Sequence, residues 1–140
     1  MRPELQIFLV LIASAFICLG ASGGGCSPCL NGGYGGFCEV SVDQARQMLQ
    51  DSVLVVDIRV QNLYETSHIP GAINACFCSF PASFDQISDR KTEDILIYAS
   101  NDALRATAPP QLVYLGFTNI HFMVGGFDEW VERGFETEGQ

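Results

Sequence analysis

The fold of this 140-residue chain is decided by residues 55–75, VVDIRVQNLYETSHIPGAINA. The stretch begins within a continuous apolar, β-branched run, SVLVVDI (52–58), which is typical of a strand buried on both faces of a parallel sheet. A second apolar run, GAINACF (71–77), predicts the next strand. Asp57 and Arg59 stand where the first strand ends. We interpret them as an ion pair at the rim of the sheet, with a role in shaping a site loop as the alternative.

Outside this stretch, short apolar runs alternate with segments of helical pattern. Strands are also predicted at 37–41, 94–99 and 120–126, and helices at 41–50, around 85–89, at 103–115 and at 127–134. Ser41 and Gln44 have the spacing of a capping box at the start of the first helix. Pro109 and Pro110 must break the third helix or delay its start. The alternation predicts a single α/β domain, with a mostly parallel central sheet flanked by helices on both faces.

The N-terminal residues lie outside this predicted domain, which we place at 37–137. Residues 1–21 combine a weak basic start, a short apolar run and small residues, which predicts a signal peptide, with an uncleaved membrane anchor as the alternative. Residues 22–36 are rich in Gly and Cys and predict a flexible tether. Cys26 is a candidate for lipidation. We therefore expect an exported protein that is periplasmic, attached to the cell envelope or secreted.

Charge and cysteine content narrow the functional class. The formal net charge is −9, and the few basic residues are scattered, so nucleic acid is not an expected partner. Removal of the signal peptide would leave five cysteines: Cys26, Cys29, Cys38, Cys76 and Cys78. An exported chain meets an oxidising compartment, so disulfides are expected. The odd number leaves one cysteine free, paired with another chain or lipidated.

Two blocks of the sequence resemble the rhodanese family. Its pattern of Asp-x-Arg, an aromatic residue and His-Ile-Pro-Gly-Ala-x-Asn corresponds to Asp57, Arg59, Tyr64, His68, Ile69, Pro70, Gly71, Ala72 and Asn74. The segment 114–135, YLGFTNIHFMVGGFDEWVERGF, is similar to the family's closing segment. The resemblance spans Cys38 to Phe135 and implies the rhodanese-like fold. For active members it implies sulfurtransferase chemistry, in which a loop cysteine takes a sulfane sulfur from thiosulfate or another donor and passes it on.

The resemblance also implies that this cysteine stands first in the loop that follows Tyr98, which corresponds to the family's last strand residue. Here the loop reads Ala99, Ser100, Asn101, Asp102, Ala103, Leu104 and Arg105. In the register without a gap, Ala99 stands at the family's cysteine position, Asp102 at a position usually occupied by glycine, and Leu104 at one usually occupied by arginine. A loop one residue longer would instead place Arg105 at the arginine position. Neither register supplies a nucleophile at Ala99. Asp102 adds a negative charge that opposes an anionic donor.

Cys76 and Cys78 are the alternative thiols, because they follow the second strand toward the same rim. Extended residues two apart have Cα atoms ~6.5–7 Å from each other, so a disulfide between them requires a turn. The alternatives are separate bonds to Cys29 or Cys38, or a reactive thiol at the site. The Cys-x-Cys and Cys-x2-Cys spacings could ligate zinc, but the exported context and the lack of a nearby histidine argue against it, and we predict no metal and no cofactor.

The remaining polar candidates receive structural interpretations. Ser100 would need an adjacent base to act as a nucleophile, so it is interpreted as a turn residue. Asp57, Arg59 and Arg105 are the candidate binding residues.

The sequence predicts a catalytically degenerate, exported rhodanese-like domain that acts as a binding or accessory module for an unknown protein or small ligand. The alternative is a sulfurtransferase or sulfur carrier that uses Cys76 or Cys78. Membrane attachment would be through the N-terminus or a lipidated Cys26.

Overall fold

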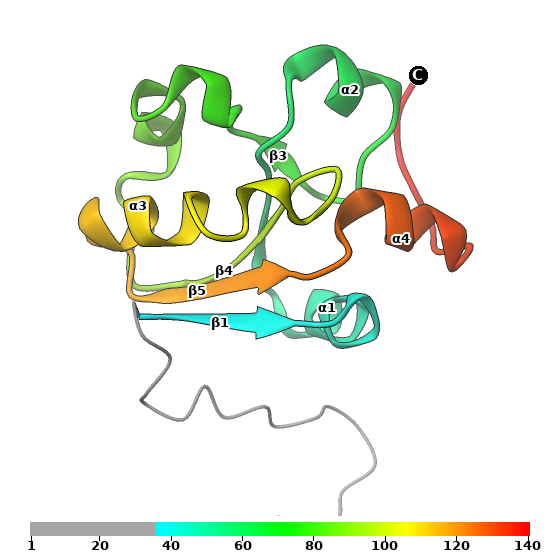
Figure 1. Cartoon of the computed structure of the whole chain (residues 1–140), viewed down its shortest axis with the longest axis horizontal. Helices are drawn as coiled ribbons and strands as arrows, with labels where there is room; N and C mark the ends of the chain where they lie inside the picture. Colours follow the sequence, from blue (N-terminus) through cyan, green and yellow to red (C-terminus); the bar gives the residue numbers. More distant parts are fainter. Residues whose placement is uncertain (1–35) are drawn as a thin grey trace, which may run out of the picture.

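Short apolar strands form a parallel sheet in residues 36–140, the part of the chain that this computed structural model describes (Figure 1). The strands are β1 (Phe37–Val40), β2 (Leu54–Asp57), β3 (Ile73–Asn74), β4 (Asp94–Tyr98) and β5 (Asn119–Met123). They lie in the order β1-β5-β4-β2-β3, and every neighbouring pair is parallel. The predicted fold class is confirmed, and the carboxyl ends of the strands meet at one edge of the sheet.

Helices cover both faces of this sheet. They are α1 (Val42–Met48), α2 (Gln61–Thr66), α3 (Ala108–Tyr114) and α4 (Gly126–Glu132), with 3₁₀ turns η1 (Leu49–Asp51), η2 (Phe77–Ser79), η3 (Ala82–Ile87) and η4 (Asp102–Leu104). Successive strand residues point to opposite faces. On β4, Ile97 therefore packs with Phe84 of η3 and Leu112 of α3. Leu96 packs in a second buried cluster, with Trp130 of α4 and residues of α1.

Local sequence signals account for two helix starts. The capping box is present: the Gln44 N–H donates to Ser41 Oγ at 3.2 Å, and the Ser41 N–H donates to Gln44 Oε1 at 2.8 Å. The helix predicted over 103–115 is broken, as its prolines required. The turn η4 ends first, and α3 then begins late with the prolines in its first turn.

Two elements differ from the sequence prediction. The short helix α2 was not predicted, because its six residues bury no side chain and so show no apolar periodicity. Strand β3 is shorter than the predicted 71–77. The chain leaves the sheet after Asn74 and enters η2, in which the Ser79 N–H donates to the Cys76 carbonyl.

Three features predicted from the sequence lie outside the described residues: the signal peptide or anchor (1–21), Cys26, and nearly all of the tether (22–36). Within 36–140, no helix has the length and apolar character that crossing a membrane requires. At the other end of the chain, Glu138 pairs with His68 through two backbone hydrogen bonds of 2.7 and 2.8 Å. The last residues are thereby joined to the segment between α2 and β3.

Candidate functional site

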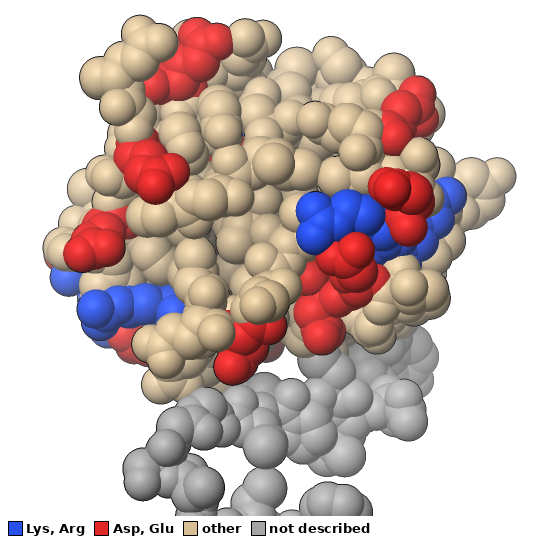
Figure 2. Space-filling view, turned by 180° about the vertical axis from the view of Figure 1, so that it is seen from behind, with Lys and Arg blue, Asp and Glu red and all other residues tan. Residues whose placement is uncertain are grey.

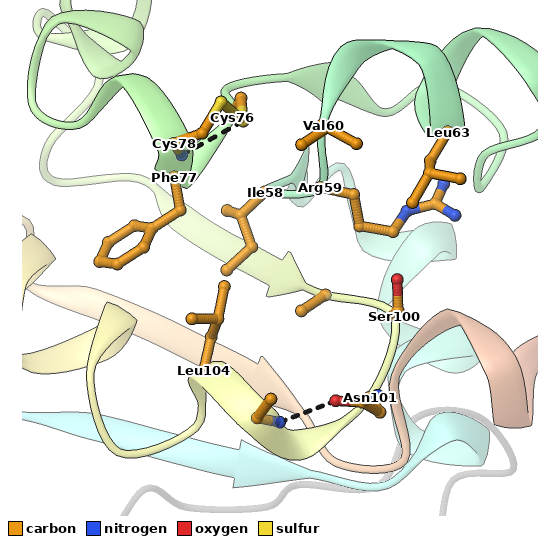
Figure 3. A pocket seen from close by; sticks show the side chains of 12 residues that line it. Ile58, Arg59, Val60, Leu63, Cys76, Phe77, Cys78, Ser100, Asn101 and Leu104 are labelled. Carbon is orange, nitrogen blue, oxygen red and sulfur yellow. Dashed lines mark hydrogen bonds between the residues drawn. A yellow bond between two sulfur atoms is a disulfide. The ribbon is translucent and has the colours of Figure 1, made fainter.

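A pocket of about 470 Å³ opens at the carboxyl edge of the sheet, where the segments after β2, β3 and β4 meet (Figure 3). Its lining residues are Ile58, Arg59, Val60, Leu63, Cys76, Phe77, Cys78, Ala99, Ser100, Asn101, Ala103 and Leu104. Seven of these twelve carry only hydrocarbon side chains, and none is a carboxylate. Sites in parallel α/β sheets lie at this edge, and the pocket's chemistry suits an apolar ligand group.

Ala99 forms part of the pocket wall at the start of the loop after β4, and only 6 % of its surface is exposed. The backbone there is held by the start of α4, because the Phe127 N–H donates to the Ala99 carbonyl at 2.8 Å and the Asp128 N–H to the Ser100 carbonyl at 3.0 Å. Gly126 makes this approach possible: its φ is +64°, and a Cβ would lie 2.5 Å from the Ser100 carbonyl oxygen. The loop scaffold is therefore tightly positioned, with a methyl group at its first position.

The polar loop side chains bind backbone groups. Asn101 accepts a hydrogen bond from the Ala103 N–H at 2.9 Å, and Asp102 accepts one from the Gly125 N–H at 2.8 Å. Asp102 does not line the pocket, so its charge is directed at the β5–α4 junction. Ser100 does line the pocket, but neither histidine of the chain is among the lining residues.

Arg105 lies away from the pocket, although it was predicted as a binding residue. Its guanidinium forms an ion pair with Glu39 of β1, with an Nε–Oε1 distance of 2.5 Å. The hydrogen bond from Arg105 holds the pKa of Glu39 below its usual value. Leu104, one position earlier, faces the pocket instead.

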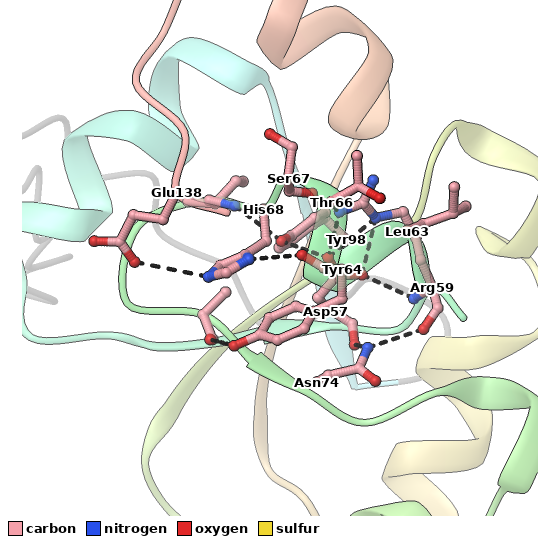
Figure 4. Close-up of polar contacts among 12 residues, drawn as sticks. Asp57, Arg59, Leu63, Tyr64, Thr66, Ser67, His68, Asn74, Tyr98 and Glu138 are labelled. Carbon is pink, nitrogen blue, oxygen red and sulfur yellow. Dashed lines mark hydrogen bonds and ion pairs between the residues drawn. The ribbon is translucent and has the colours of Figure 1, made fainter. Parts of the chain in front are cut away.

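Asp57 and Arg59 form the expected ion pair beneath the rim (Figure 4). Asp57 is fully buried, and Arg59 Nη2 lies 2.6 Å from its Oδ2. The Tyr98 hydroxyl donates to the same oxygen at 2.7 Å and accepts the Ile69 N–H at 3.1 Å. Burial, and next the negative charge of Asp57, raise the pKa of Tyr98, so the hydroxyl stays protonated. Arg59 also donates to the Ser67 carbonyl and lies 3.9 Å from the ring centroid of Phe127.

The other residues of the front block hold the turn before β3. Tyr64 stacks on His68 with a centroid distance of 3.9 Å, and His68 Nδ1 lies 2.7 Å from the Tyr64 carbonyl oxygen. Asn74 Nδ2 donates to the carbonyls of Asp57 and Arg59. These contacts join the β2 end, the turn and β3 into one polar network.

Every described basic side chain has an identified partner. Arg59, Arg90, Arg105 and Arg133 form ion pairs with carboxylates, whereas Arg46 and Lys91 lie over aromatic rings. On the face drawn in Figure 2, blue basic groups accordingly lie against red acidic ones. The described residues therefore hold no uncommitted cation at the pocket for an anionic substrate.

Cys76 and Cys78 form a disulfide with each other, with Cα atoms 5.2 Å apart. The turn η2 supplies the bend that this bond requires, so the alternative of separate bonds to Cys29 or Cys38 is wrong for both residues. Cys38 is also disulfide-bonded. Within residues 36–140, no group of three or more His, Cys, Asp or Glu side chains is placed to hold a metal ion.

The apolar walls of the pocket are not indicated by the sequence. Val60 and Leu63 are each 43 % exposed, and with Phe77 they line the side formed by the segments after β2 and β3. The one sequence signal was that Val60 and Leu63 are apolar although α2 buries no side chain. That signal points to a pocket wall only when the fold shows the segments after β2, β3 and β4 lying together.

The family model of the rhodanese-like domain matches residues 41–133. Thiosulfate sulfurtransferase GlpE of Haemophilus influenzae is 31 % identical over 94 residues, which covers 67 % of this chain and 88 % of that protein. Thiosulfate sulfurtransferase 16, chloroplastic, of Arabidopsis thaliana is 26 % identical over 109 residues, covering 71 % and 91 %. The solution structure of the rhodanese-like domain of Anabaena sp. Alr3790 superposes with a TM-score of 0.64 at 24 % identity, covering 73 % and 79 %. This last likeness concerns the fold alone.

We expect Asp57→Asn to lower the free energy of unfolding by about 3–5 kcal/mol, because the buried Arg59 loses its counter-charge. Urea unfolding followed by circular dichroism measures the change. Glu39→Gln is the matched control, since it removes the carboxylate of an exposed Arg105 pair, and its effect should be small. Equal effects of the two substitutions would contradict the assignment of Asp57 as the organising charge.

Proposed function

The chain belongs to the rhodanese-like domain family, and from this premise we propose that it is a binding module that no longer performs thiosulfate-type sulfur transfer at the loop after β4. The observation that carries the proposal is Ala99, a methyl group at the first position of that loop. A persulfide requires a thiolate, and neither a methyl nor the neighbouring Ser100 hydroxyl can supply one.

The charge arrangement supports the same proposal. An anionic sulfur donor needs cations or directed N–H groups in its binding site. Arg59 is committed to Asp57 and Ser67, Arg105 to Glu39, and the Ala103 N–H to Asn101. The remaining walls are mostly hydrocarbon, where transfer of an anion from water is costly.

The same walls suit a different occupant. We propose that the pocket takes an uncharged, predominantly apolar group, either a small ligand or a side chain of a partner protein. The exposed rim residues Val60 and Leu63 extend the apolar surface from the pocket to its mouth. Burial of such surface contributes roughly 25 cal/mol per Å².

We further propose that the domain is exported through cleavage of the N-terminal apolar segment, with lipidation at Cys26 as the alternative. Support comes from the signal-like residues 1–21 and from the disulfide state of Cys38, Cys76 and Cys78. Disulfides persist in oxidising compartments and are rare where thiols are kept reduced.

A second candidate function is persulfide formation on Cys76 or Cys78. The observation that favours it is that both cysteines line the pocket that contains Ala99. Their disulfide contains no thiolate, so this sulfurtransferase or sulfur-carrier function requires prior reduction of the pair.

The purified domain is expected to transfer no sulfur from thiosulfate to cyanide above the uncatalysed rate, measured as thiocyanate. Ala99→Cys should introduce slow transfer, and Ala99→Cys/Leu104→Arg should raise it about tenfold, which corresponds to ~1.4 kcal/mol. Ala103→Cys is the matched control, because it places a thiol on the same wall outside the nucleophile position. Turnover by the unmodified domain would overturn the proposal. If the reduced domain gains one sulfur atom on Cys76 or Cys78 by mass spectrometry, the second candidate replaces it.

Leu63→Glu should weaken binding of the uncharged dye Nile red by at least about fivefold, because a carboxylate at the pocket mouth removes apolar contact. Fluorescence titration measures the dissociation constant. Val131→Glu is the control, since Val131 is 51 % exposed on α4 and does not line the pocket. Equal weakening by both substitutions would place the dye elsewhere on the protein.

Mass spectrometry of the mature N-terminus tests export. We expect cleavage after Ala21 or Gly23, or a lipidated Cys26, in protein recovered from the cell envelope or medium. A full-length chain that starts at Met1 and stays in the cytoplasmic fraction would contradict the proposal.

A further inference from the structure

We propose that Cys76–Cys78 is a redox-active disulfide that exchanges with thiols entering the pocket. The exchange rests only on this pair and its surroundings. Its preference for thiols on apolar groups rests on the proposed binding function. The chemistry moves two electrons and no sulfur atom, which separates it from persulfide transfer.

The two cysteines differ in exposure. Both residues line the pocket, and Figure 3 shows them at its upper wall, across the opening from Leu104. Cys76 is only 9 % exposed, whereas Cys78 is exposed at the rim. An incoming thiolate therefore attacks the sulfur of Cys78, and Cys76 is the leaving group.

The structure also stabilises the leaving group. The backbone N–H of Cys78 donates to Cys76 Sγ at 3.2 Å. A hydrogen bond of this kind favours the thiolate over the thiol, and a thiol of lower pKa leaves faster in disulfide exchange. Cys78 Sγ has a longer contact, 3.8 Å from the Ser79 hydroxyl oxygen. The difference in burial and the shorter hydrogen bond at Cys76 thus assign the same roles to the two cysteines.

A purely stabilising role accounts poorly for this bond. Disulfides stabilise chiefly by closing long loops in the unfolded chain, and this one joins residues only two positions apart. Backbone contacts already hold the segment: the Phe77 N–H donates to the Ile58 carbonyl at 3.0 Å, and the Ser83 hydroxyl to the Cys76 carbonyl at 2.8 Å. These contacts do not involve the sulfur atoms, so the segment can keep its place when the bond is reduced.

The reaction balances with thiols as the only co-reactant. A substrate thiolate forms a bond to the sulfur of Cys78, the Cys76–Cys78 bond breaks, and Cys76 departs as a thiolate. A second substrate thiolate then attacks the substrate sulfur of the mixed disulfide, which releases Cys78 as a thiolate. Two substrate thiols become one substrate disulfide, the pair becomes a dithiol after protonation, and another disulfide reoxidises it by the reverse steps.

The pocket selects the substrate class. Its walls are mostly hydrocarbon, and its one cation, Arg59, is paired with Asp57. A thiol carried on an uncharged aromatic or aliphatic group fits these walls, whereas a small peptide thiol with several charges does not. The substrate is therefore a thiol on an apolar small molecule, or a partner's cysteine flanked by apolar side chains.

The test reacts the mature, oxidised protein with benzyl mercaptan or with glutathione at equal thiolate concentration. Iodoacetamide trapping and peptide mapping follow Cys76 and Cys78, with circular dichroism to verify that the fold persists. We expect both cysteines to become alkylated in the folded protein, at least tenfold faster with benzyl mercaptan. A pair that stays oxidised until the protein unfolds would overturn the exchange. Equal rates with the two thiols would support exchange and remove the apolar preference, and with it the proposed binding role of the pocket.

Single variants test the assigned roles. With dibenzyl disulfide, Cys76→Ser should accumulate a mixed disulfide on Cys78, because no neighbouring thiol remains to resolve it. Cys78→Ser should react at least tenfold more slowly, because its remaining thiol is buried. Comparable trapping in both variants would overturn the assignment of Cys78 as the entry sulfur. The measurements on the unmodified protein stand even if a variant fails to fold.

Discussion

The buried carboxylate of Asp57 is the constraint on which the rest of the site depends. A fully buried charge is tolerable only with a counter-charge and hydrogen bonds, and Asp57 obtains them from Arg59, Tyr98 and the Arg59 backbone. These groups belong to β4 and to the segment that leaves β2. Satisfying one carboxylate therefore fixes the position of two neighbouring strand ends, and Tyr98 extends the network to Ile69 in the turn before β3.

The pairing of Arg59 with Asp57 determines the charge that the pocket presents. Arg59 is the only cation among the lining residues, and its charge is directed inward to Asp57 and toward the face of Phe127. The loop after β4 is held in place by α4, because Gly126 lets this helix approach the Ala99 and Ser100 carbonyls. The tightly positioned loop is thus combined with apolar walls, an arrangement that agrees better with the proposed uncharged occupant than with an anionic donor.

Elements with a strong local or motif signal were predictable from the sequence. The apolar strands β2 and β4, the Ser41 capping box and the Asp57–Arg59 pair depend on residues close in the chain or on a recognisable block. Features that depend on distant contacts were not predictable. Arg105 pairs with Glu39, 66 positions away, and the turn that allows Cys76 and Cys78 to bond is held in part by the Ile58 carbonyl. The pocket itself combines three segments, none of which has a site signature alone.

The position of the sulfur atoms determines which chemistry the pocket can support. Under the proposed function, sulfur transfer at the loop needs a thiolate at the position of Ala99, which carries a methyl group. The sulfur atoms at the pocket belong to another wall and are joined as a disulfide. In that state the pair accepts electrons from thiols but cannot accept a sulfane sulfur, because it offers no thiolate. After reduction the pair no longer accepts electrons from thiols, and its thiolates can accept a sulfane sulfur. The oxidation state of Cys76 and Cys78 therefore separates the two proposed chemistries, and the more exposed Cys78 is the entry point for either of them.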